Sequence, residues 1–207
     1  MKKIVFCDLP MRTDLYALRY PVDGNKTIEY DGEVIFPING VLARIMNGQD
    51  DVKVVLLLKD SDGNNNEANV QKFKTELETI NLGIGAKISY KIIQTPFEET
   101  RKTHEYLYRE MIGQLEKGAE LIVDITYGPK PLPIIMFSVM NFAERFFGCE
   151  IQNIVYGKVD FVSSSKIPVN PVIYDLTPLY TLNGLMNEMK YSSAEEAVKA
   201  LDIILSL

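Results

Sequence analysis

The residues best suited to chemistry in this 207-residue chain lie in one stretch, residues 124–133 (DITYGPKPLP). An apolar run of strand length precedes it and a helical pattern follows it. Within it, Thr126 supplies a hydroxyl, Gly128 lets the backbone approach a ligand closely, and Lys130 supplies positive charge. Such groups at the start of a helix predict a site for a phosphate or a ribose. The same spacing also fits a sharp strand-to-helix turn that bears a solvated lysine.

The loop inside this stretch has a particular donor set. Pro129, Pro131 and Pro133 lack backbone N–H groups, which costs a helix little in its first turn. Hydroxyls and Lys130 must therefore make more of the ligand contacts than backbone amides do. Tyr127 and Pro129 complete the candidate loop. A strand–loop–helix junction at the carboxyl edge of an open parallel sheet is where ligands usually bind.

Other loop residues are expected at the same sheet edge. Arg12 and Thr13 follow the first apolar run, and Lys59 follows the second. The carboxyl ends of parallel strands meet at one edge, so these side chains are candidates for ligand contacts. Basic residues in loops are also common on ordinary solvated surface.

These residues need elements that position them. Near-continuous apolar runs, typical of parallel strands covered on both faces, occupy residues 3–9, 52–58, 87–94 and 120–126. Between them, apolar residues recur at helical spacing over residues 38–46, 70–80 and 104–115. Strand–helix alternation predicts an α/β fold, a doubly wound, mainly parallel sheet with helices on both faces.

The last third of the chain has different patterns. The helix from Pro131 is apolar around most of its circumference, so it must be covered on two sides, by the sheet and by a second subunit. Burial within the monomer is the alternative, and light scattering of a Phe137→Glu variant distinguishes them. Residues 151–156 and 171–176 predict an edge hairpin joined by a polar loop. Helices are expected over 183–190 and, after a Ser cap, toward the chain end.

Composition and charge exclude several classes. The net charge is −6, which disfavours binding to duplex nucleic acid. Cys7 and Cys149 lie far apart, as in a reducing compartment, and no targeting segment or membrane span is evident. We therefore expect a cytoplasmic protein. Cys7 is expected in the core.

Other reactive residue types fit structural roles better. His104, the only histidine, lies on an apolar helix face and is expected to be at least partly buried. The acidic group Glu98, Glu99, Glu105 and Glu110 is expected to be the solvated face of that helix. No Cys/His metal set, dinucleotide-binding glycine motif or Walker lysine loop occurs, so no metal or cofactor is expected.

The stretch at 124–133 resembles the signature of CRISPR-associated Rossmann fold (CARF) domains. In that family a strand ends in Asp-x-Thr-x-Gly, and an Arg or Lys soon follows. Residues 30–36 (YDGEVIF), 156–157 (YG) and 172–178 (VIYDLTP) resemble one subfamily. The similarity touches most of residues 1–180. It implies a Rossmann-like sensor domain over 1–180, with 181–207 as a helical extension of the same domain.

The resemblance also implies a ligand and a partner. Members bind a cyclic tetra- or hexa-adenylate in a symmetric homodimer pocket and act in type III CRISPR antiviral signalling. Thr126 and Lys130 would then contact phosphates or 2′-hydroxyl groups. Many members carry an effector domain after the sensor, and none is evident here, so the effector is expected on a separate chain or on a missing part of a longer one.

Two alternatives stay open. Some stand-alone relatives cleave the ring slowly without metal, by attack of a ribose 2′-hydroxyl on the adjacent phosphate. Lys130 could stabilise the developing charge in that reaction and Thr126 could orient the ring. The other alternative is a Rossmann-like domain for another nucleotide or a protein partner.

Overall fold

The computed structural model describes residues 1–60, 66–162, 167–191 and 193–205. The chain divides into two compact units, Met1–Asp175 and Leu176–Leu207. The polar loop predicted around 163–166 and the segment 61–65 lie outside the described residues.

The first unit is built on a seven-stranded sheet with the order β2-β7-β6-β5-β1-β3-β4. Neighbouring strands run parallel except β6 and β7, which form an antiparallel hairpin. The strands are β1 (Lys2–Asp8), β2 (Val22–Asp23), β3 (Asp51–Asp60), β4 (Lys87–Pro96), β5 (Glu120–Asp124), β6 (Glu150–Phe161) and β7 (Pro168–Asp175). This confirms the predicted Rossmann-like, mainly parallel sheet.

One strand has no counterpart in the sequence pattern. The two-residue β2 pairs with β7 beyond the hairpin, joining Val22 to Ile173 and Asp23 to Tyr174. The long connection after β1 folds back along the hairpin and satisfies part of its open edge. A strand this short leaves no periodicity in the sequence.

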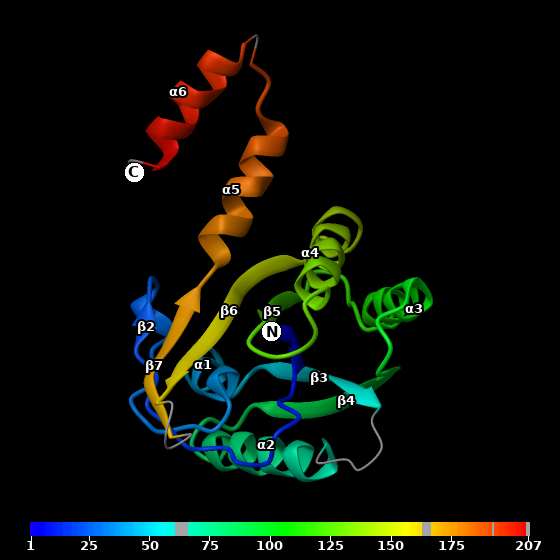
Figure 1. Ribbon diagram of the computed structural model, residues 1–207, viewed down its shortest axis with the longest axis vertical. Coiled ribbons are helices and arrows are strands. Elements are labelled where there is room, and N and C mark those ends of the chain that lie inside the picture. Colours follow the sequence, from blue (N-terminus) through cyan, green and yellow to red (C-terminus); the bar gives the residue numbers. More distant parts are fainter. Residues whose placement is uncertain (61–65, 163–166, 192, 206–207) are drawn as a thin grey trace. The chain divides into compact units, whose positions relative to one another are not determined.

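Helices cover both faces of the sheet. As Figure 1 shows, α1 (Pro37–Ile45) and α2 (Asn66–Asn81) lie on one face, and α3 (Arg101–Ile112) and α4 (Leu132–Phe142) lie on the other. A short 3-10 turn, η1 (Lys26–Ile28), precedes α1, and α4 continues into one π-helical turn, η2 (Ala143–Phe147). Gly148 ends that turn in the left-handed conformation, with φ 59°.

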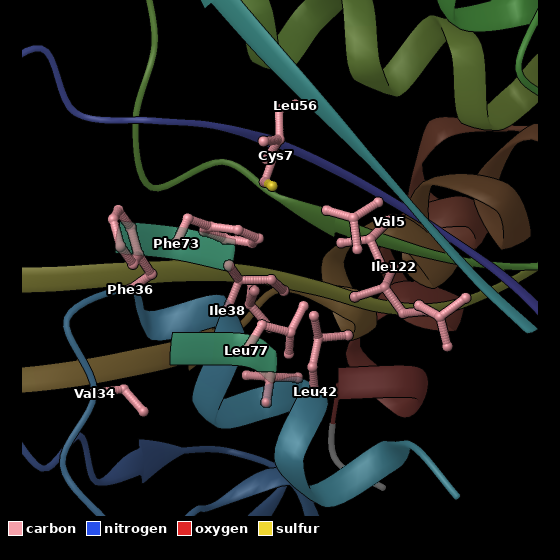
Figure 2. Close-up of a cluster of buried hydrophobic side chains, with 14 of the residues drawn as sticks. Val5, Cys7, Val34, Phe36, Ile38, Leu42, Leu56, Phe73, Leu77 and Ile122 are labelled. Atoms are coloured by element: carbon pink, nitrogen blue, oxygen red, sulfur yellow. The ribbon is translucent and has the colours of Figure 1, made fainter. Parts of the chain in front are cut away.

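The core explains why the strand patterns are continuous rather than alternating. Val5 and Cys7 face α1 and α2, where Phe36 and Phe73 meet edge to face with ring centroids 5.2 Å apart (Figure 2). Phe6, between Val5 and Cys7, is equally buried because α3 and α4 cover the opposite face. The prediction that Cys7 belongs to the core is confirmed.

Helix α4 is buried on one side only. Leu132, Met136, Val139 and Met140 are buried within the unit. Ile134, by contrast, is 71% exposed, although it is as apolar as the buried set. Burial within the monomer therefore does not account for the whole apolar circumference of this helix.

The second unit consists of α5 (Thr177–Glu188) and α6 (Ala194–Leu205). The helix predicted at 183–190 starts earlier, because Pro178 fits the first turn of a helix. The predicted serine cap of the last helix is present, since Ser193 Oγ accepts a hydrogen bond of 3.2 Å from the N–H of Glu196. None of the described helices has the length and apolar character needed to cross a membrane.

Candidate functional site

The strand order places a crevice at the carboxyl ends of the central strands. From β1 the chain crosses to β3 on one side, whereas β5 pairs with β1 on the other and continues to β6. Strand order therefore reverses between β1 and β5. In open α/β sheets, ligands bind at such a switch point, outside the carboxyl ends of the strands.

A cleft of about 500 Å³ lies at this point. Its walls come from the carboxyl ends of four neighbouring strands and the loops after them: residues 8–12 at the end of β1, Lys59 near the end of β3, Phe97 and Glu99 after β4, and 127–129 after β5. The cleft thus brings together the predicted residues Arg12, Lys59, Tyr127, Gly128 and Pro129. Thr13, Thr126 and Lys130, which were also predicted, are not among its lining residues.

Gly128 makes the turn that the sequence predicts. Its φ is 104°, a backbone conformation that residues other than glycine rarely adopt. A Cβ here would lie 2.5 Å from Leu132 Cδ2 and 2.7 Å from Asp8 Oδ2. The 127–129 loop therefore sits directly against the end of β1.

The hydroxyl of Thr126 is hydrogen-bonded to residues of the sheet. Its hydroxyl hydrogen-bonds the Asp124 carboxylate and accepts a 2.7 Å hydrogen bond from the N–H of Gly157 on β6. A Cβ at Gly157 would lie 2.5 Å from Pro37 Cγ, so only glycine fits there. The Asp-x-Thr part of the motif thus fastens β5 to β6, and the Tyr-Gly-Pro part lines the cleft.

Besides Thr126, two other predicted residues lie outside the cleft. Lys130 is exposed just before α4. Thr13 is exposed as well, and its carbonyl accepts a hydrogen bond of 3.3 Å from Lys72 Nζ. The loop from Pro10 to Thr13 is thus bound to α2 through its backbone carbonyls.

Arg12 is held by contacts on both sides. Its guanidinium lies over the Phe161 ring, 4.7 Å from the centroid. Its carbonyl accepts a 2.9 Å hydrogen bond from Asn69 Nδ2, which also donates to the Pro10 carbonyl at 2.6 Å. Asn69 is fully buried on α2. Sequence reasoning missed this anchor, whose signal is a polar residue beside Val70 in an apolar pattern.

Lys59 is the most buried cation of the cleft, at 8% exposure. Its ammonium lies 2.5 Å from Glu99 Oε1 and donates to the Pro96 carbonyl at 3.1 Å. The other carboxylate oxygen of Glu99 is 2.7 Å from His104 Nε2. His104 is half-buried, as predicted for this face of α3.

The acidic group around α3 needs a correction. Glu98 and Glu99 were expected on the solvated face of this helix, but α3 begins only at Arg101. Thr100 is its N-cap and accepts a 3.2 Å hydrogen bond from the N–H of Thr103. Glu99 therefore belongs to the loop after β4, which directs it into the cleft.

Buried carboxyl groups form the inner end of the site. Burial raises the pKa of Asp8 to about 7, against the lowering effects of the Leu9 N–H and Lys59. Burial likewise raises the pKa of Asp124 to about 6, although Thr126 donates two hydrogen bonds to it. Burial also raises the pKa of the Tyr127 hydroxyl, which therefore stays protonated and can donate a hydrogen bond.

The resulting chemistry suits an anion that carries a flat apolar group. Arg12 and Lys59 supply positive charge, and Phe97 presents an aromatic ring that is 60% exposed. Exposed aromatic rings beside cations are the usual platform for a base attached to a phosphate. Among the described residues, no group of three or more His, Cys, Asp or Glu could hold a metal ion.

Comparison with known proteins yields one informative similarity. No family model matches the chain. Over 83 residues, or 40% of its length, the chain is 25% identical to the CRISPR-associated protein MJ1674 of Methanocaldococcus jannaschii. The matched region covers 13% of that protein, so the chain corresponds to a small part of it.

Proposed function

We propose that the cleft binds a cyclic oligoadenylate, a ring of four or six AMP units, as the sensor of a type III CRISPR antiviral system. The observation that carries the proposal is the cleft at the switch point, which gathers Arg12, Lys59 and the 127–129 loop. Similarity to a CRISPR-associated protein supports the biological setting. The resemblance of residues 124–133 to CARF domains supports the class of ligand.

The cleft offers contacts for the phosphate and for the base of an AMP unit. Arg12 and Lys59 fit the phosphates, because charge-assisted hydrogen bonds to anions are the strong ones. Phe97 fits an adenine by stacking. A cleft of about 500 Å³ is the size that holds one drug-sized ligand. A ring of four or more nucleotides is larger, so each of two symmetric protomers would hold part of it.

Calorimetry with cyclic tri-, tetra-, penta- and hexa-adenylate tests the proposal. We expect one ring to bind tightly with a stoichiometry of one ring per two chains. Failure to bind any of the four rings would overturn the proposal and favour another nucleotide or a protein partner.

Mass spectrometry of the same mixtures tests turnover. Linear fragments would establish a ring nuclease. Thr126 and Lys130 have weak support as residues that promote cleavage, because the Thr126 hydroxyl is engaged by Asp124 and Gly157 and Lys130 does not line the cleft. If the Lys130→Ala variant cleaves the ring at the wild-type rate, cleavage must depend on groups other than Lys130.

Arg12→Ala should weaken ring binding on the order of 10- to 100-fold, because it removes a charge-assisted contact to phosphate. Arg19→Ala is the matched control: Arg19 lies in the same long connection but pairs with Asp31 at 2.7 Å and does not line the cleft. Calorimetric dissociation constants of both variants check this. Equal affinities for the two variants would remove Arg12 from the binding site.

Ile134→Glu should convert the proposed homodimer to a monomer, because a carboxylate would replace an exposed apolar side chain on α4. Leu82→Glu is the control, since Leu82 is 88% exposed and follows α2 on the opposite face. Light scattering gives the mass of each variant. Phe137 is half-buried, so its replacement would also disturb packing. A dimeric Ile134→Glu protein would place the interface elsewhere.

A further inference from the structure

Glu99 stands between the buried cation of the cleft and the only histidine of the chain. One carboxylate oxygen is 2.5 Å from Lys59 Nζ, and the other is 2.7 Å from His104 Nε2. The three residues come from three places: the end of β3, the loop after β4, and α3. Glu99 and Lys59 both line the cleft, whereas His104 lines the neighbouring groove between α3 and α4.

This arrangement obstructs the ligand that the cleft is proposed to take. A phosphate that binds Lys59 must approach the ammonium already paired with Glu99. It would also meet the negative charge of Glu99, and like charges at contact distance repel. Glu99 carries that charge at neutral pH. Burial tends to raise its pKa, but the hydrogen bonds of Lys59 and His104 lower it by more.

His104 is a second hydrogen-bond partner for the Glu99 carboxylate. Its ring already contacts the oxygen that faces away from Lys59, so the carboxylate can release Lys59 and keep one partner. The side chains of Glu99 and His104 are 32% and 30% exposed, which leaves them more freedom than Lys59 at 9%. The mobile side of the pair is therefore the carboxylate.

We propose that Glu99 is an anion gate: it occupies Lys59 in the empty cleft and is retained by His104 when a phosphate takes its place. The inference rests on the proposed function for the identity of the phosphate donor. Its consequence is selectivity. A single phosphate that displaces Glu99 from Lys59 has the contacts of one cleft only, whereas a ring is anchored by several AMP units. The gate therefore disfavours mononucleotides, which lack those further contacts.

Glu99→Gln tests the gate by a gain of affinity. We expect binding of inorganic pyrophosphate to tighten on the order of tenfold, because one charge-assisted competitor is removed. AMP should bind more tightly as well. Glu98→Gln is the control, since it removes the same charge from the adjacent residue, which does not line the cleft. Unchanged or weaker pyrophosphate binding by folded Glu99→Gln protein would overturn the proposal.

A double-mutant cycle separates the gate from a structural role of His104. His104→Ala should weaken pyrophosphate binding, because Glu99 then has only Lys59 as a partner. In the Glu99→Gln background, the same change should have little effect, since no carboxylate remains to be retained. Equal losses in both backgrounds would mean that His104 acts on the fold and not through Glu99.

The wild-type protein supplies an independent readout. The chain has one histidine, so its ring nitrogen resonances belong to His104 without assignment work. Saturating pyrophosphate should shift them, and Lys59→Met should shift them without ligand, because both free Glu99 for His104. Failure of all four rings to bind, with the pyrophosphate effects intact, would refute the proposed ligand and keep the gate. Bound pyrophosphate with unmoved His104 resonances would refute the gate alone.

Discussion

Asp8→Asn should increase the free energy of unfolding at pH 8 by on the order of 4 kcal/mol. Asp8 is 6% exposed at the end of β1, and burial raises its pKa from 3.8 to about 7. Each pKa unit corresponds to about 1.4 kcal/mol, so the ionised carboxylate costs the fold this much above pH 7. An amide can still accept the 2.6 Å hydrogen bond from the N–H of Leu9 without carrying charge.

The sign of the pH dependence follows from proton counts. Because the folded pKa of Asp8 is raised, the folded protein keeps a proton that the unfolded chain releases near pH 4. The contribution of Asp8 to stability must then fall as pH rises from about 4 to about 7, and it levels off above that range. The gain from Asp8→Asn should therefore be absent at pH 3 and complete at pH 8.

Urea unfolding between pH 3 and pH 8 measures this difference. Asp14→Asn is the control, because Asp14 is exposed and follows the same loop. Its curve should run parallel to that of the wild type. A loss of stability in Asp8→Asn at pH 8 would show that the contacts of the carboxylate outweigh the cost of its burial.

Gly128→Ala should lower the free energy of unfolding by about 3 kcal/mol, the sum of a strained backbone and an overpacked contact. The φ of 104° disfavours any side chain, and the new Cβ would lie 2.5 Å from Leu132 Cδ2 and 2.7 Å from Asp8 Oδ2. Affinity for the proposed ring ligand should fall as well, because relief of this contact moves the 127–129 loop that lines the cleft.

Gly118→Ala separates the two causes. Gly118 also has a left-handed backbone, with φ 69°, but a Cβ there would meet no atom within 4 Å. Its replacement should cost about 1–2 kcal/mol, from the backbone alone, and should leave ring affinity unchanged. Urea unfolding and calorimetry of the two variants give the comparison. Equal stability losses would mean that the side chains of Leu132 and Asp8 move aside at little cost. The contact of Gly128 with them would then not fix the 127–129 loop.

The sequence alone determined the class of fold and the place of the turn at Gly128 along it. The apolar run at β1 is continuous because both faces of the sheet are covered. This pattern predicts a buried strand even when the helices that cover it are not known. The turn at Gly128 was likewise predictable, because a glycine between a strand and a proline-rich helix start has few other uses. Both are local properties, which spacing and residue type express directly.

Only the tertiary structure decided which side chains line the cleft. Its residue type and position made Thr126 a candidate for ligand contact. Because β6 lies beside β5, however, the Thr126 hydroxyl accepts a hydrogen bond from the N–H of Gly157. The sequence predicts Glu99 on the third helix, but Thr100 is the N-cap of α3. Glu99 therefore precedes the helix, and its carboxylate lies in the cleft beside Lys59. Strand order and loop direction arise from contacts between segments far apart in the chain. Residue spacing within one segment does not encode them.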